Sequence, residues 1–103
     1  TKQEPFGPLV PILTFKKFDE VVERSNNNEL GLASYIYTND MEKANKASEL
    51  METGTVAVNT PVVAVAEAPF GGIKQTGYGR EGGSMAIKDY LNIKYTHMGV
   101  HYE

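Results

Sequence analysis

Apolar residues are concentrated in short runs along this 103-residue chain, and each run predicts an element of secondary structure. Residues 9–15 (LVPILTF), 32–38 (LASYIYT) and 55–59 (TVAVN) are rich in aliphatic, aromatic and β-branched side chains, which favours three strands. Between the first two runs, Phe18, Val21 and Val22 lie on one face of a short helix that begins at Phe18. The residues 26–28 (three asparagines) and Gly31 end this helix, because they tolerate a left-handed backbone.

A second helix is predicted to follow residues 32–38. Asn39 is the expected N-cap, with Glu42 three residues later completing a capping box. Glu42 and Lys46 have the i,i+4 spacing of a favourable ion pair, and Gly54 stands where a helix C-cap is expected. The expected buried side of this helix consists of Met41, Ala44, Ala47, Leu50 and Met51.

Strands and helices thus alternate, with short connections. Such alternation predicts an α/β fold with a parallel sheet and flanking helices. A long loop over residues 60–76 is expected next, then a third helix over residues 80–91 and a last β-like run over residues 92–98.

Composition excludes several classes of protein. Apolar residues make up 41% and charged residues 22%, as in an ordinary globular domain, and the net charge of −3 includes no basic stripe for nucleic acid. No apolar run approaches the roughly 18 residues that a membrane-spanning helix needs. The first residues do not resemble a signal peptide, and we expect none. We therefore expect a cytoplasmic protein with no membrane or nucleic-acid partner.

The chain has no cysteine, which excludes disulfides, thiolate metal sites and a cysteine nucleophile within these residues. His97 and His101 are four residues apart, but they fall in the last β-like run and the tail, with no cluster of carboxylates. We expect no metal site.

Residues 77–82 (GYGREG) match the G-x-G-x-x-G spacing of loops that hold a dinucleotide pyrophosphate. A genuine fingerprint follows a strand, opens a helix and has an acidic residue about 20 residues later. Here the motif follows the glycine-broken stretch APFGGIKQT, and the acidic residue at that distance is Glu103, the last of the chain. We interpret GYGREG as a shaped turn and not as a nucleotide-binding loop.

Three stretches, in order and at matching spacing, resemble the aldehyde dehydrogenase family. Residues 3–8 (QEPFGP) are similar to its E-x-F-G-P motif, and residues 54–59 (GTVAVN) are similar to its G-x-V-x-V-N strand. Residues 68–74 (APFGGIK) with residues 77–81 (GYGRE) are similar to its P-F-G-G-x-K-x-S-G-x-G-R-E signature. The resemblance covers essentially the whole chain and implies the C-terminal part of the enzyme: residues 1–91 from the catalytic domain, and residues 92–103 as an oligomerisation strand and tail.

The resemblance implies an NAD(P)-dependent oxidation of an aldehyde to a carboxylic acid. The family's cysteine nucleophile and its water-activating glutamate lie upstream of E-x-F-G-P, so this chain is expected to be inactive alone and to contain no catalytic residue. By the resemblance, Glu4 hydrogen-bonds the nicotinamide ribose of NAD or NADP, and Phe6 packs near the nicotinamide. Phe70 is expected to be an aromatic residue of the substrate pocket, and Val62 and Ala64 are expected to line its variable loop.

The resemblance is less specific about the substrate and about the oligomeric state. Residues 67–72, 79–83 and 93–95 look most like the succinate-semialdehyde dehydrogenase branch, although the pocket loop over residues 61–66 (PVVAVA) lacks the hydroxyl that often meets the substrate carboxylate there. The last β-like run implies a homo-oligomer formed through a C-terminal strand, with an ordinary edge strand or a tail as the other interpretation. A different class of function also stays open: a freestanding, non-catalytic oligomerisation or interaction module derived from the same fold.

Overall fold

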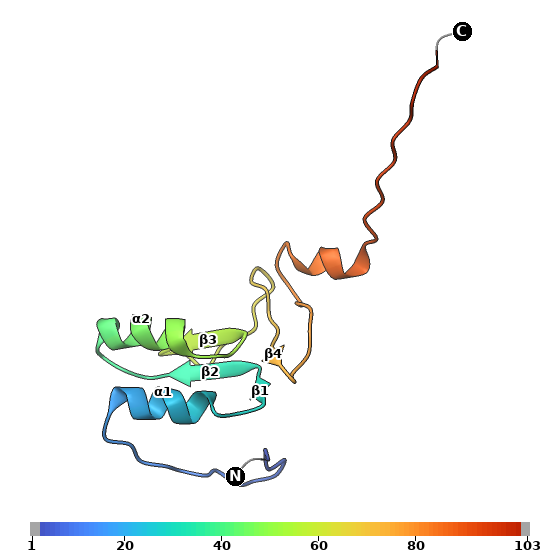
Figure 1. The fold of residues 1–103 in the computed structure, drawn as a ribbon. Helices are drawn as coiled ribbons and strands as arrows, with labels where there is room; N and C mark the ends of the chain where they lie inside the picture. Colours follow the sequence, from blue (N-terminus) through green and yellow to red (C-terminus); the bar gives the residue numbers. More distant parts are fainter. Residues whose placement is uncertain (1–2, 102–103) are drawn as a thin grey trace.

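The computed structural model describes residues 3–101 of the chain. Its elements follow in the order α1 (Phe18–Asn26), β1 (Leu30–Gly31), β2 (Ala33–Ile36), α2 (Met41–Leu50), β3 (Thr55–Val58), β4 (Ile73–Lys74) and the 3₁₀ helix η1 (Ala86–Tyr90). Helix α2 lies beside β2 and β3 and contacts both, while the chain after η1 runs away from this body (Figure 1).

Helix α1 begins at Phe18, as the hydrophobic spacing predicts, and buries Val22. Its exposed side has an i,i+4 ion pair, with 3.1 Å between Glu20 Oε1 and Arg24 Nη1. The helix is also held to α2, because Lys46 Nζ lies 4.9 Å from the centroid of the Phe18 ring. A lysine over an aromatic face is a favourable cation–π arrangement.

Helix α2 begins one residue later than the sequence predicts. Its N-cap is Asp40, not Asn39, and the Asp40 side chain accepts a hydrogen bond from the backbone N–H of Lys43 at 3.1 Å. A carboxylate in the first turn satisfies an amide that has no partner within the helix. The expected pair of Glu42 and Lys46 is not formed: Lys46 lies 3.7 Å from Asp19 of α1 instead.

The buried side of α2 is narrower than predicted. Ala44 and Ala47 are buried, whereas Met41 and Leu50 are exposed. The helix ends at Leu50, and its C-cap is Met51, not Gly54. The side chain of Asn26 completes this end, because its Nδ2 donates to the Leu50 carbonyl and its Oδ1 accepts from the Glu52 N–H.

The strands form two separate pairs. Strands β2 and β3 are parallel, with Ala33 opposite Thr55, and α2 connects them, which confirms the α/β character expected from the sequence. Strands β1 and β4 are antiparallel, with Leu30 opposite Lys74, and this pair was not expected from the sequence. Strand β4 also lies within the stretch predicted to be a long loop.

Three predicted elements do not form. Residues 9–15 are extended but pair with no strand, and Pro8 and Pro11 supply no amide hydrogen there. The helix predicted over residues 80–91 shrinks to η1, because Gly82 and Gly83 have φ of 72° and 62°, outside the helical region. Residues 91–101 form no strand and are exposed along their whole length.

Few side chains are buried in the described part of the chain. The buried apolar residues are Val22, Ala44, Ala47 and Ala57, all small or medium-sized. The radius of gyration is 19.9 Å, whereas a compact domain of this length has about 13 Å. No helix among the described residues is long and apolar enough to cross a membrane.

Candidate functional site

The loop over residues 70–81 is closed on itself by backbone hydrogen bonds. The loop leaves and returns at one point, where Phe70 and Glu81 exchange two backbone N–H···O hydrogen bonds of 2.7 Å each. Strand β4 forms its outgoing limb, and a turn closed by the Gly77 N–H on the Lys74 carbonyl, at 3.3 Å, reverses the chain. We call residues 70–81 the signature loop.

Glycines allow the two limbs of the signature loop to lie close together. A Cβ on Gly71 would lie 2.6 Å from the carbonyl oxygen of Gly79 on the returning limb. Gly77 and Gly79 have φ of 111° and 89°, which residues with a side chain rarely adopt. The GYGREG sequence therefore shapes the return of this loop, as its sequence context predicted.

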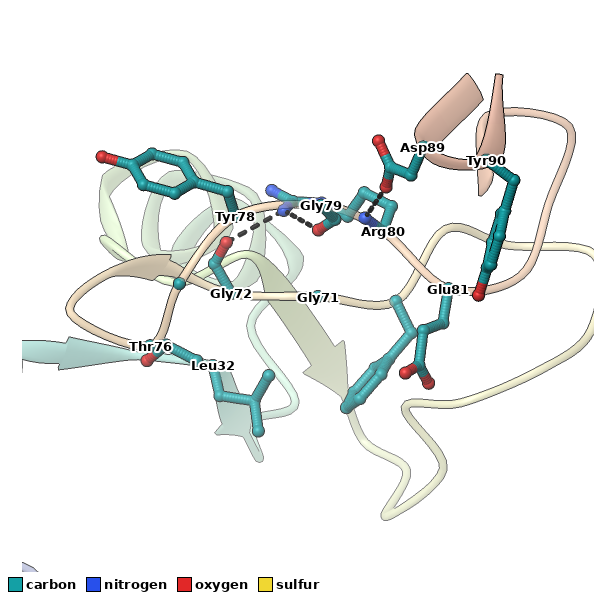
Figure 2. Close-up of a pocket in the computed structure, with 12 residues that line it drawn as sticks. Leu32, Gly71, Gly72, Thr76, Tyr78, Gly79, Arg80, Glu81, Asp89 and Tyr90 are labelled. Atoms are coloured by element: carbon teal, nitrogen blue, oxygen red, sulfur yellow. Dashed lines mark hydrogen bonds between the residues drawn. The ribbon is translucent and has the colours of Figure 1, made fainter. Parts of the chain in front are cut away.

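Arg80 connects the two limbs. Its Nη1 donates to the carbonyl of Gly72 at 2.9 Å and to that of Gly79 at 2.7 Å, as the dashed lines in Figure 2 show. The backbone N–H of Arg80 in turn donates to Asp89 Oδ2 of η1 at 2.9 Å (Figure 2). The Arg80 side chain and Asp89 of η1 thus hold the returning limb in place.

A hollow of about 250 Å³ lies along the signature loop, and we call it the loop hollow. Phe70, Tyr78 and Tyr90 are its aromatic lining residues. Figure 2 shows Tyr90 beside Glu81 and Tyr78 at the opposite end of the view. Besides these aromatic residues, its lining consists of Leu32, Gly71, Gly72, Thr76, Gly77, Gly79, Arg80, Glu81 and Asp89.

A larger hollow of about 730 Å³ lies between the N-terminal segment and the strands, and we call it the arm hollow. Its size is within the range of small-molecule sites. Glu4 and Phe6 line it from the N-terminal segment, and Phe6 is 96% exposed. The other lining residues are Gln3, Pro5, Ser25, Asn28, Leu30, Gly31, Leu32, Ala33, Ser34, Thr53, Gln75 and Thr76.

The two hollows share Leu32 and Thr76 in their linings and are therefore neighbours. The Thr76 hydroxyl accepts a hydrogen bond from the Gly31 N–H at 2.8 Å, which holds the end of the signature loop to β1. Lys74 adds a second connection: its Nζ donates to the Asn26 carbonyl at 2.8 Å and pairs with Glu52. These contacts fix β4 and the turn of the signature loop to α1, to β1 and to the chain after α2.

Comparison with known proteins assigns this chain to a family. The model of the aldehyde dehydrogenase family matches residues 1–96. The chain belongs to the aldehyde dehydrogenase family. It is 52% identical over 97 residues to a 3-sulfolactaldehyde dehydrogenase of Pseudomonas putida, covering 94% of this chain and 20% of that protein. It is 44% identical over 100 residues to the NADP(+) succinate-semialdehyde dehydrogenase GabD of Escherichia coli, covering 97% of this chain and 21% of that protein.

A solved structure shows the same fold in an aldehyde dehydrogenase. The NAD+ complex of the enzyme from Bacillus cereus superimposes with a TM-score of 0.86 at 42% identity, covering 90% of this chain and 19% of that chain. The chain thus spans about a fifth of the length of the family members that it matches.

The structure places the residues implied by the family resemblance in different parts of the site. Glu4 and Phe6 lie together in the arm hollow, and Phe70 lies in the loop hollow. Val62 and Ala64 lie in the exposed segment after β3 and line neither hollow.

Sequence reasoning missed Leu32, Thr76, Arg80 and Asp89 as lining residues. Arg80 could have been suspected, because it is the one cation inside GYGREG. Leu32 and Asp89 carry no comparable signal, since their role depends on contacts between distant segments.

The two histidines are apart from both hollows. The hydroxyl of Tyr95 lies 3.1 Å from Nδ1 of His97 in the exposed C-terminal segment. Within residues 3–101, no three residues among His, Cys, Asp and Glu are grouped so that they could hold a metal ion.

Proposed function

We propose that this chain supplies part of the cofactor site and part of the substrate pocket of an NAD(P)-dependent aldehyde dehydrogenase, which oxidises an aldehyde to a carboxylic acid. The observation that carries the proposal is the adjacency of the two hollows, one lined by Glu4 and Phe6 and the other by Phe70. Hydride transfer needs a cofactor and a substrate that are held in contact. Two neighbouring hollows with a common wall fit that requirement.

The residues of the arm hollow fit the nicotinamide end of a dinucleotide. Glu4 is exposed, and a carboxylate can accept hydrogen bonds from both hydroxyls of a ribose. Phe6 is almost fully exposed beside it and offers an apolar face to a flat ring. Bound NAD or NADP would supply the hydride acceptor, and these two side chains would hold and orient its ribose and ring.

For the substrate side, we propose that Phe70 forms a wall of the pocket and that Val62 and Ala64 complete it from the loop after β3. Phe70 is half-buried, while Val62 is 58% exposed and thus free to contact other parts of the enzyme. The loop hollow has two carboxylates, Glu81 and Asp89, and one guanidinium, so it offers no excess of positive charge. The carboxylate of succinate semialdehyde would therefore have to be bound elsewhere in the enzyme.

We further propose that the chain assembles as a homo-oligomer through residues 92–103. Residues 92–101 are extended and exposed, with Ile93 101% and Tyr95 83% exposed. An extended segment presents a row of backbone donors and acceptors to which another strand can be added.

The first experiment is to read the complete coding sequence that contains this chain and to assay its product. We expect a reading frame that encodes a cysteine upstream of Glu4, and a protein that reduces NAD or NADP when given an aldehyde. A complete product that equals this cysteine-free chain would contradict the dehydrogenase proposal and favour a non-catalytic interaction module. Succinate semialdehyde and butanal, which have the same number of carbon atoms, test whether the substrate is acidic.

A second experiment tests Glu4. In the complete protein, Glu4→Gln is expected to raise the cofactor KM about tenfold, because an amide offers the ribose a weaker, uncharged acceptor. The aldehyde KM should change far less. Glu23→Gln, at an exposed position on α1, is the matched control. Equal effects of the two variants would remove Glu4 from the cofactor site.

A further inference from the structure

The two limbs of the signature loop meet at Phe70, and one side chain controls how far apart they lie. Resting on the function proposed above, we propose that Arg80 is a positioning residue that sets the place of Phe70 in the substrate pocket. Arg80 lines the loop hollow, but the role proposed here rests on its Nη1, which donates to two backbone carbonyls.

The hydrogen bonds of Arg80 join the limbs close to Phe70. A guanidinium Nη carries two N–H groups, and Arg80 Nη1 donates to Gly72 on the outgoing limb and to Gly79 on the returning limb. Gly72 is two residues beyond Phe70, and Arg80 directly precedes Glu81, the backbone partner of Phe70. Each bonded carbonyl is thus only two residues along the chain from Phe70 or from its partner Glu81. A change in the separation of the limbs therefore moves the backbone of Phe70.

The stem of Arg80 also occupies the space beside Gly71. A Cβ placed on Gly71 would lie 2.8 Å from Arg80 Cδ, so the stem is packed against the residue that follows Phe70. Arg80 cannot easily move away, because Asp89 holds its backbone N–H at 2.9 Å. Truncation of Arg80 would thus remove both the connection between the limbs and the packing next to Phe70.

Kinetics of single and double variants of the complete protein test this proposal. We expect Arg80→Ala to raise the aldehyde KM about tenfold, since small misplacements in a site have large effects, with little change in the cofactor KM. In a Phe70→Ala background, Arg80→Ala should raise the aldehyde KM no further, because the residue through which it acts is gone. Equal rises in both backgrounds would show that Arg80 does not act through Phe70 and would overturn the proposal. If Arg80→Ala yields no soluble protein, Arg80→Lys, which keeps the charge but not the planar fork, gives the same comparison.

A spectroscopic measurement tests whether Arg80 positions Phe70, independently of whether Phe70 lines the substrate pocket. With 4-fluorophenylalanine at position 70 of the complete protein, we expect one narrow ¹⁹F resonance that shifts or splits on Arg80→Lys. Arg24→Lys is the matched control, since Arg24 also donates to a backbone carbonyl, that of Thr14 at 3.0 Å, but lies on α1. An unchanged resonance with Arg80→Lys would overturn the proposal. A shifted resonance in a protein whose aldehyde KM is unaffected by Phe70→Ala would instead keep the positioning role and remove Phe70 from the substrate pocket.

Discussion

The chain by itself exposes more surface than a compact protein of the same mass. The structure has an accessible surface of 9284 Å², whereas a compact protein of 11.3 kDa has about 5,700 Å². Much of the excess is apolar: Ile12 is 83% exposed, Ile93 101% and Met98 83%. When the chain is produced by itself, we therefore expect self-association or the absence of a cooperative thermal transition.

Sedimentation velocity over a range of concentrations measures the association, and small-angle scattering measures the radius of gyration. Ile93→Asp with Val100→Asp should reduce the association, because both replaced side chains are exposed and apolar. Asn92→Asp with Thr96→Asp is the matched control, with the same added charge on the same exposed segment. A monodisperse monomer that melts cooperatively, with a radius of gyration of about 13 Å, would refute the reasoning.

Two further predictions concern helix α2 and its neighbour β3. Asp40→Ala should destabilise the first turn of α2 through loss of the N-cap, seen as faster hydrogen exchange at the Lys43 amide, whereas Asp40→Asn should keep most of the protection. Hydrogen bonds from Lys43 lower the pKa of Asp40 below its ordinary value. The stabilisation from the carboxylate is therefore present above that ordinary value and is lost as the pH falls through the lowered pKa. The change in the protection factor of the Lys43 amide with pH should vanish in Asp40→Asn. Gly54→Ala should lower the Tm of the complete protein by more than Gly7→Ala does. A Cβ at position 54 would collide with the Gly71 backbone, whereas a Cβ at position 7 would meet nothing within 4 Å. Equal Tm values for the two variants would contradict the close packing of Gly54.

The local elements of this fold could be predicted from sequence, because they depend on neighbouring residues. The start of α1 at Phe18 and the strand at Thr55 followed from the spacing of apolar residues. The N-cap was placed one residue early because Asn39 and Asp40 are both good capping residues, and only the backbone geometry decides between them.

Elements that depend on distant partners could not be predicted in the same way. Residues 9–15 and 92–98 have the composition of strands, but a strand needs a neighbour to accept its hydrogen bonds, and no neighbour lies beside them among residues 3–101. Strand β4 was missed for the opposite reason: its two residues are too short a signal, and their pairing with β1 creates the strand.

In the candidate site, too, some residues could be predicted from local motifs, whereas others depend on contacts between distant segments. Motif resemblance named Glu4, Phe6 and Phe70, and the structure places them in two adjacent hollows. The contribution of Thr76 to the common wall arises only when the signature loop folds back on Gly31, a contact across much of the chain.

The two strand pairs differ in the number of residues between their paired strands, and this difference predicts the order in which they form. Ala33 pairs with Thr55, whereas Leu30 pairs with Lys74, about twice as far along the sequence. Because closing a longer loop costs more entropy and contacts between distant residues form slowly, we expect β2, α2 and β3 to form an early folding unit. The signature loop then docks last, so variants at Gly72 or Thr76 should leave the first kinetic phase of refolding unchanged and slow the final one.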